Sequence, residues 1–255
     1  MDRSALVSRL RETPAGHRII TALDTGSADQ ALELARAMGS GQRYVKVGLE
    51  LFSAAGPAVV QGLRELDRQV FLDLKYHDIP NTVAKAATQG AALGAVMCTI
   101  HAQAGRGAMT AAAVALGAYG REQGTRPALL AVTILTSLSE DEIGEASPSP
   151  DSLPERIERL ARLAWDCGCD GLVCSAADLP RLRGVIGPEP LVVTPGIRPA
   201  GSGLDDQHRV TTPRAAMAAG ADFLVIGRPI TQADDPAAAL ADLAAELETA
   251  GGTST

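Results

Sequence analysis

The chain has 255 residues, of which 46% are hydrophobic and 21% are charged, and its formal net charge is −7. This length suits one large α/β domain or two small ones, and the hydrophobic content argues against wholesale disorder. The negative charge and the lack of a basic tract argue against nucleic acid as the main partner, although a locally basic site could still bind a small anion.

No apolar run reaches the ~18 residues that a membrane-spanning helix needs. The N-terminal stretch MDRSALVSRLRETPAG is too polar for a secretory signal. We therefore expect a cytoplasmic protein without a membrane partner.

Short runs rich in apolar and β-branched residues recur along the chain and are typical of strands. In chain order they are RIITALD (18–24), YVKVGLE (44–50), QVFLDLK (69–75), AVMCTIH (95–101), ALLAVTIL (128–135), GLVCS (171–175), PLVVTPGI (190–197) and DFLVIG (222–227). Segments with helical spacing separate them, and strands that alternate with helices form a parallel sheet. Eight such units predict a closed (β/α)8 TIM barrel, a single domain over residues 1–255. A doubly wound open sheet is the alternative.

Two further segments have a distinct composition. Residues 139–154, SEDEIGEASPSPDSLP, are rich in Pro and Ser and predict a loop with a short helix after the fifth strand. The Ala-rich stretch after Asp235 predicts a closing helix.

Two of the four cysteines are expected in the core, and the other two lack the spacing of a metal site. Cys98 and Cys174 lie in apolar strand-like runs, where a free cysteine packs as a small hydrophobic residue. Cys167 and Cys169 flank a single glycine, which is not a usual zinc-ligand spacing. We therefore expect no metal site at these cysteines.

Polar residues gather where a barrel would place its chemistry, because the active site of a TIM barrel lies at the C-terminal ends of the strands. The residues at or near these ends are Asp24, Lys46, Asp73, Lys75, His101, Thr136, Ser175, Arg198 and Arg228. The lysines among them stand out, because only three of the 23 basic residues are lysine. Arginine cannot release a proton near neutral pH, whereas lysine can.

The stretch FLDLKYHDIPNTV (71–83) concentrates these charges. Alternate residues of a strand share a face, so Asp73 and Lys75 should project to the same side, while Leu72 and Leu74 face the helices. Lys46 should also point inward, because a lone lysine among apolar helices would be costly, and the neighbouring strand then brings it near Asp73.

This cluster of charges has two interpretations. One is a structural ion-pair network. The other interpretation is a catalytic site, because buried ion pairs stabilise a fold only weakly. There the fixed charges would form a preorganised field that favours a carbanion, and an ammonium group would then protonate it.

The last two strands predict a phosphate site. Loops after strands seven and eight of such barrels often bind phosphate, and here they contain glycines that let backbone amides approach an anion. Arg198 and Arg228 add guanidinium groups suited to phosphate oxygens. Ordinary turn glycines and solvated arginines are the alternative.

Taken together, DLKYHDIPNTV, YVKVGLELF, TPGIRP followed by DDQHR, and IGRPI resemble the bacterial type of orotidine 5'-phosphate decarboxylase. The resemblance runs from ALD at 22–24 to GRPI at 227–230. It implies a homodimeric carboxy-lyase that converts orotidine 5'-monophosphate to uridine 5'-monophosphate and CO2 in de novo pyrimidine biosynthesis, without a metal or cofactor.

The resemblance also implies residue roles. Lys75 would deliver a proton to C6 of the substrate, within an alternating catalytic network of Lys46, Asp73, Lys75 and Asp78. The substrate-binding residues would be Asp24, Lys46, Asp73, Thr82, Thr136, Arg198, Gln207, Gly227 and Arg228. Thr136 would contact the pyrimidine, although its neighbour Ser137 is the alternative. Asp78 and Thr82 would reach into the active site of the partner subunit.

Two rival functions remain open. Magnesium-dependent sugar-phosphate decarboxylases and aldolases of the same superfamily also carry the Asp-x-Lys-x-x-Asp motif. A metal-binding Glu is expected there in place of Lys46, and a lysine repels a divalent cation. A non-catalytic protein that binds a phosphate-containing ligand is the second rival.

Overall fold

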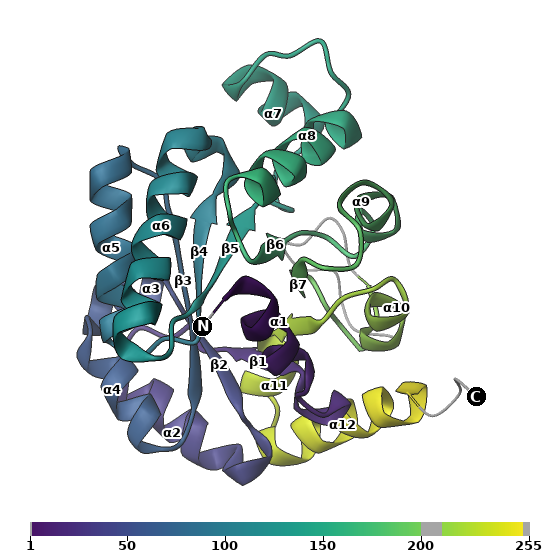
Figure 1. Ribbon diagram of the computed structural model, residues 1–255. Helices are drawn as coiled ribbons and strands as arrows, with labels where there is room; N and C mark the ends of the chain where they lie inside the picture. Colours follow the sequence, from purple (N-terminus) through teal and green to yellow (C-terminus); the bar gives the residue numbers. More distant parts are fainter. Residues whose placement is uncertain (1, 200–210, 252–255) are drawn as a thin grey trace.

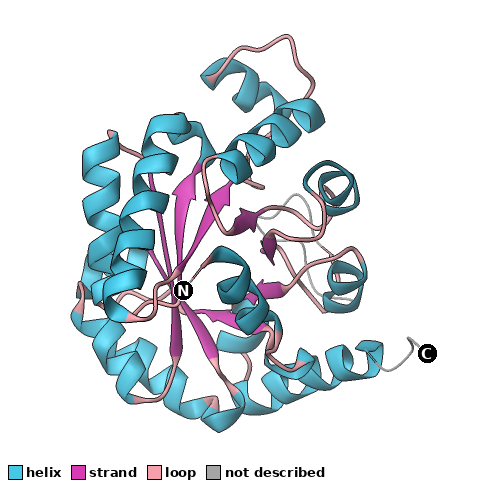
Figure 2. Ribbon diagram, viewed as in Figure 1, coloured by secondary structure: helices cyan, strands magenta, loops and turns pink. Residues whose placement is uncertain are grey.

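The computed structural model describes residues 2–199 and 211–251. Within them, strands pair in parallel in the order β1 to β8 and close into a barrel, with helices around it (Figures 1 and 2). The strands are β1 (Ile19–Ala22), β2 (Tyr44–Gly48), β3 (Gln69–Tyr76), β4 (Met97–His101), β5 (Ala128–Val132), β6 (Gly171–Val173), β7 (Leu191–Thr194) and β8 (Phe223–Ile226). The predicted TIM barrel is confirmed, and the open doubly wound sheet is wrong.

Helices follow the strands, as the alternation predicted. They are α1 (Arg3–Arg11), α2 (Ala28–Ala37), α3 (Leu49–Ala55), α4 (Ala58–Glu65), α5 (Pro80–Ala92), α6 (Gly105–Gln123), α7 (Glu140–Ala146), α8 (Leu153–Asp166), α9 (Leu179–Ile186), α10 (Pro213–Ala218), α11 (Arg228–Thr231) and α12 (Pro236–Gly251). The predicted short helix within 139–154 is α7, whose first turn is closed by a capping box between Ser139 and Glu142. The predicted closing helix is α12. None of the helices in the described residues is both long and apolar enough to cross a membrane.

Alternate strand residues divide between two hydrophobic cores. Val45 and Leu72 pack into the larger core, between the barrel wall and the helices. Tyr44 and Phe71, one residue away on the same two strands, pack into a second core inside the barrel. There the Tyr44 ring meets the Phe223 ring edge-on, with 5.1 Å between centroids. The interior of the barrel is therefore filled with side chains.

Helix α1 adds its apolar side chains to the inner core, which the sequence analysis did not predict. Leu6, Val7 and Leu10 are buried and cluster with the inward-facing strand residues. In Figure 1, α1 lies across the middle of the ring of strands. The spacing of these three residues along the helix, which places them on one face, was the available signal.

All four cysteines are free and buried. Cys98 and Cys174 are buried in the outer core, which confirms their assignment to the core. Cys167 and Cys169 are buried there as well.

Candidate active site

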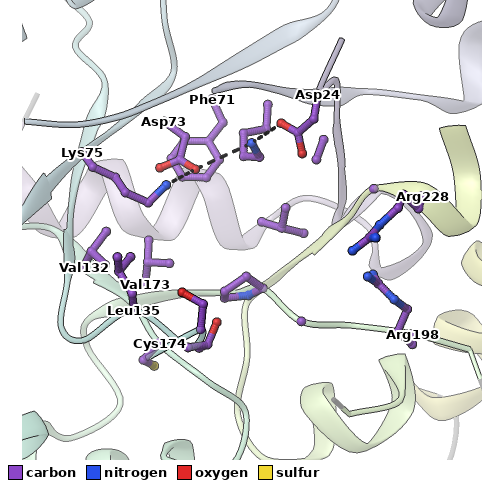
Figure 3. Close-up of a pocket in the computed structure, with 18 of the residues that line it drawn as sticks. Asp24, Phe71, Asp73, Lys75, Val132, Leu135, Val173, Cys174, Arg198 and Arg228 are labelled. Atoms are coloured by element: carbon purple, nitrogen blue, oxygen red, sulfur yellow. Dashed lines mark hydrogen bonds and ion pairs between the residues drawn. The ribbon is translucent and has the colours of Figure 1, made fainter. Parts of the chain in front are cut away.

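A cavity of about 400 Å³ opens at the C-terminal ends of the strands (Figure 3). Its volume is within the range of small-molecule sites. It is lined by Ala22, Asp24, Lys46, Phe71, Asp73, Lys75, Val132, Ile134, Leu135, Thr136, Ser137, Val173, Cys174, Pro195, Gly196, Arg198, Val225, Gly227, Arg228, Thr231 and Gln232. The charged residues among them separate into an acid–lysine cluster on one side and two arginines on the other.

The acid–lysine cluster is a continuous chain of ion pairs. Nζ of Lys46 lies 2.9 Å from Oδ1 of Asp24 and 3.8 Å from Oδ2 of Asp73. Nζ of Lys75 lies 2.9 Å from the same Oδ2 atom of Asp73. The predicted proximity of Lys46 to Asp73 and the shared inward face of Asp73 and Lys75 are both confirmed. Charges alternate along the chain, so each cation has an anionic neighbour in a partly buried setting.

An irregular stretch of β3 positions this cluster. Pairing with β4 runs from Leu72 opposite Cys98 to Tyr76 opposite Ile100, so β3 uses more residues than β4 over this stretch. Within it, Lys75 has φ of 49°. A non-glycine residue in this left-handed region is uncommon and costs about 1–3 kcal/mol, and such strain is frequent at functional sites. The sequence predicted the face of Lys75 but not this backbone conformation.

The opposite side of the cavity carries the two arginines predicted to bind phosphate. Arg198 follows β7 and is only 7% exposed, while Arg228 is the first residue of α11, directly after β8. Figure 3 shows their guanidinium groups turned toward each other. Gly227 lines the cavity beside Arg228. Two cations facing one space favour an anion between them. Gln207, also predicted for this site, lies outside the described residues.

An apolar wall joins the two charged sides, and the sequence analysis assigned none of it to the site. Phe71, Val132, Leu135 and Val173 all line the cavity. The signal for Phe71 was its alternation with Asp73 and Lys75 on one strand, which places it on the same face. Such a wall can accept the faces of a planar ring while the charged sides orient it.

Both residues considered as contacts of the pyrimidine ring lie at the cavity. Thr136 and Ser137 each line the cavity in the turn after β5. Thr136 is half-buried and Ser137 is exposed. The choice between them stays open.

Asp78 and Thr82 are not among the residues that line the cavity of their own chain. Both are exposed, Asp78 in the turn after β3 and Thr82 in the first turn of α5. The carboxylate of Asp78 accepts a hydrogen bond from the backbone N–H of Ile79, at 2.6 Å. The structure of one chain therefore does not join these two residues to the site.

Two titratable groups near the cluster have shifted pKa values. Burial, followed by the nearby His77 and Lys75, lowers the pKa of His101 from its ordinary value of 6.5. Burial raises the pKa of the Cys174 thiol to about 12. His101 is thus neutral at pH 7, and Cys174 presents a protonated thiol to the cavity.

Within residues 2–199 and 211–251, no three His, Cys, Asp or Glu side chains are grouped so that they could hold a metal ion. The two carboxylates nearest to one another in the cavity instead share the ammonium of Lys46. What the site offers is a set of fixed charges and one apolar wall.

Comparison with known proteins shows the family of this chain. The model of the orotidine 5'-phosphate decarboxylase / HUMPS family matches residues 17–243. An orotidine 5'-phosphate decarboxylase of Sodalis glossinidius (strain morsitans) is 47% identical over 256 residues, covering 98% of this chain and 99% of the relative. One of Synechococcus sp. (strain WH7803) is 50% identical over 244 residues, covering 94% of this chain and 99% of the relative.

Solved structures give the same result. The crystal structure of orotidine 5'-phosphate decarboxylase from Lactobacillus acidophilus superposes with a TM-score of 0.81 at 38% identity, over 90% of this chain and 98% of that one. An uncharacterized conserved protein from Geobacillus kaustophilus superposes with a TM-score of 0.80 at 38% identity, over 90% of this chain and 99% of that one. With its barrel superposed on those of solved structures and its sequence matched over nearly its whole length, this chain belongs to the orotidine 5'-phosphate decarboxylase / HUMPS family.

Proposed function

We propose that the protein decarboxylates orotidine 5'-monophosphate to uridine 5'-monophosphate and CO2, as a carboxy-lyase of de novo pyrimidine biosynthesis. One observation carries this proposal. A single cavity has the alternating ion pairs of Asp24, Lys46, Asp73 and Lys75 on one side and the facing guanidinium groups of Arg198 and Arg228 on the other. The first set suits an anionic reacting centre, and the second suits a phosphate. Relatives of this chain carry the name of this activity.

In this proposal, the phosphate group lies between Arg198 and Arg228, with Gly227 and Gln207 as further contacts. Asp24 and Lys46 bind the ribose hydroxyls, since they form an ion pair at the edge of the cavity and together offer an acceptor and a donor. The pyrimidine lies against the apolar wall, with Thr136 or Ser137 as its polar contact.

The reaction leaves a difficult intermediate. When the bond between C6 and the carboxylate breaks, its electron pair stays on C6 in the plane of the ring, where the π system delocalises it little. The ammonium of Lys75 stabilises this carbanion electrostatically and then transfers its proton to C6. CO2 leaves, and the neutral amine regains a proton from solvent. Asp73, 2.9 Å from Nζ of Lys75, fixes the direction of the ammonium and adjoins the substrate carboxylate.

The distant phosphate contributes through orientation. Contacts with Arg198 and Arg228 do not change during bond breaking, so their binding energy acts by holding C6 next to Lys75 and excluding water. The phosphate end of the substrate is thereby bound by residues that follow β7 and β8. The reacting end is bound by residues of β1 to β3 and the turns after them.

The proposal includes a cytoplasmic homodimer with shared sites. Asp78 and Thr82 do not line the cavity of their own chain, and both are exposed. Two of the exposed large hydrophobic residues follow paired strands: Leu49 follows β2 with 57% exposure, and Ile79, next to Asp78 in the sequence, follows β3 with 66% exposure. A second copy of the chain would cover these side chains and receive Asp78 and Thr82 in its own site.

The test is the ultraviolet absorbance of orotidine 5'-monophosphate after addition of the purified protein, with and without EDTA. Loss of the substrate band at the same rate in both samples is the expected result. Turnover that requires added magnesium would instead assign the protein to the sugar-phosphate branch. Binding of the nucleotide without loss of the band would make it a non-catalytic binder.

A further inference from the structure

Thr99, at the centre of β4, links the two residues at the heart of the candidate site. Its Oγ1 donates a hydrogen bond to Oδ1 of Asp73 at 2.9 Å and accepts one from the backbone N–H of Lys75 at 2.8 Å. We propose that Thr99 is a positioning residue that holds Lys75 and Asp73 in their reactive arrangement. This inference rests on the proposed decarboxylase function.

The irregular pairing of β3 with β4 explains why a side chain is needed here. Between the pairs Leu72–Cys98 and Tyr76–Ile100, Thr99 is the only β4 residue opposite three residues of β3. The backbone N–H of Lys75 donates a hydrogen bond to the Thr99 hydroxyl, within the stretch where the strand register shifts. The hydroxyl thus binds the backbone at the one residue of this stretch that has a positive φ, 49°.

The hydrogen bonds close a ring. The backbone N–H of Lys75 donates to the Thr99 hydroxyl, and this hydroxyl donates to Oδ1 of Asp73. Oδ2 of Asp73 then accepts a hydrogen bond from Nζ of the same Lys75. Thr99 binds the backbone of Lys75, Asp73 binds its ammonium, and the hydrogen bond between Thr99 and Asp73 links the two contacts. Because the hydroxyl both donates and accepts, hydrogen bonds in such a chain strengthen one another.

Thr99 acts on the site only through its neighbours. It is 0% exposed and is not among the residues that line the cavity. The arginines that face a phosphate come from the opposite side of the barrel mouth. Loss of the hydroxyl should therefore disturb the position of the ammonium, and with it kcat, while leaving nucleotide binding through the phosphate nearly intact.

The experiment compares three variants with the wild type. Thr99→Val keeps the shape and removes the hydroxyl, whereas Thr99→Ser keeps the hydroxyl. The matched control is Thr194→Val at the end of β7, because Thr194 is also 0% exposed and its Oγ1 has no hydrogen-bond partner among the described residues. We would measure kcat with orotidine 5'-monophosphate, the Kd of uridine 5'-monophosphate, and the unfolding temperature.

Thr99→Val should lower kcat about 10- to 100-fold, since a small misplacement of a reacting group costs that much. The product Kd should change less than about 3-fold, and Thr99→Ser and Thr194→Val should retain kcat within about 3-fold of the wild type. A Thr99→Val protein that unfolds at lower temperature but keeps wild-type kcat would overturn the proposal. If this variant does not fold, a Thr99→Ser protein with impaired kcat would overturn it as well.

A crystal structure of Thr99→Val separates this inference from the proposed function. The inference expects Lys75 to lose its positive φ and Nζ to leave Oδ2 of Asp73, whichever substrate the protein uses. An unchanged ring geometry at Asp73 and Lys75 would contradict it. A wild-type protein without activity on orotidine 5'-monophosphate would overturn the proposed function while leaving this structural test in force.

Discussion

Nζ of Lys75 donates a hydrogen bond to Oδ2 of Asp73 at 2.9 Å, although both residues come from one strand and are only two positions apart. Neighbouring inward-facing residues of a strand do not ordinarily need a change of backbone conformation to meet, yet Lys75 has a positive φ. The chain therefore accepts local strain at this position, which is reasonable if the direction of the ammonium matters more than the regularity of the sheet.

The first prediction concerns Lys75 as proton donor. Lys75→Ala should lower kcat at least about 10⁴-fold, because both the donated proton and the local positive charge are lost. Lys75→Arg should not restore activity, since a guanidinium keeps the charge but does not release a proton near neutral pH. Steady-state kinetics with orotidine 5'-monophosphate would measure both.

The remaining lysine outside the site supplies the matched control for this test. Lys85 is exposed on α5, so Lys85→Ala should leave kcat unchanged and a circular dichroism spectrum should show that all variants are folded. Substantial turnover by Lys75→Ala would remove Lys75 from the role of proton donor.

The second prediction concerns the phosphate end. Arg228→Ala should lower kcat/KM for orotidine 5'-monophosphate about 10- to 100-fold, since a hydrogen bond between charged groups contributes about 1.5–3 kcal/mol. Orotidine, which lacks the phosphate, is the control substrate. If Arg228 acts on the phosphate, the variant and the wild type should use orotidine equally poorly, whereas an equal loss on both substrates would mean that Arg228 acts elsewhere.

The third prediction concerns a buried ion pair outside the candidate site, between Asp170 and Arg126, and its contribution to stability. Asp170 is 0% exposed, accepts hydrogen bonds from Arg126 at 2.6 and 2.7 Å, and also accepts one from the backbone N–H of Leu129 at 2.8 Å. Asp170→Asn leaves the buried Arg126 charge uncompensated and should lower the free energy of unfolding by about 3–5 kcal/mol. Urea denaturation followed by circular dichroism would measure it.

An exposed ion pair is the control for that measurement. Asp151 and Arg159 lie 2.9 Å apart with side chains 38% and 63% exposed. Asp151→Asn should change the free energy of unfolding by less than about 1 kcal/mol. Equal losses for the two variants would contradict the assignment of Asp170 as a buried structural anchor.

The fourth prediction concerns the thiol that lines the cavity. Because burial raises the pKa of Cys174 to about 12, its thiolate should be scarce at pH 9, where an ordinary thiol with a pKa of about 8.5 is mostly ionised. Iodoacetamide should modify Cys174 slowly throughout pH 7–9 in the native protein and rapidly in guanidinium chloride. Mass spectrometry of tryptic peptides would measure the labelling, and rapid native labelling would show that the site opens.

The strands and the charged cluster could be predicted from sequence because both depend on local periodicity. Alternation along 69–75 determines which side chains share a face, so the inward set of Asp73 and Lys75 follows from the pleat. The same alternation places Phe71 on the face of Asp73 and Lys75, although an apolar residue carries no chemical signal of a site. The N-terminal helix α1 was not predicted, although Leu6, Val7 and Leu10 lie on one helical face.

The contacts of Thr99 could not be predicted in this way. They depend on how β3 shifts its register against β4, and no local pattern marks a shift between two strands that are separated by a helix. The positive φ of Lys75 is likewise a consequence of tertiary pairing, since lysine has no intrinsic preference for that region. Thr136 and Ser137 both line the cavity, so the structure does not decide which of the two contacts the pyrimidine.

The fifth prediction concerns the shared site. Asp78 and Thr82 are exposed and do not line the cavity of their own chain, so Asp78 is expected to complete the site of the partner subunit. Asp78→Ala and Lys75→Ala should each be nearly inactive as homodimers. Mixed in equal amounts and allowed to exchange subunits, they should form heterodimers in which one site carries both substitutions and the other carries neither.

Random exchange makes half of the dimers mixed, so about a quarter of all sites should be intact and about a quarter of the wild-type kcat should return. This recovery requires that Asp78 and Lys75 act in the same site but come from different chains. If both acted within one chain, every site in the mixture would contain one substitution and no activity would return. A mixture of Lys75→Ala with Asp73→Ala is the negative control, because Asp73 and Lys75 form an ion pair within one chain and their sites cannot complement each other.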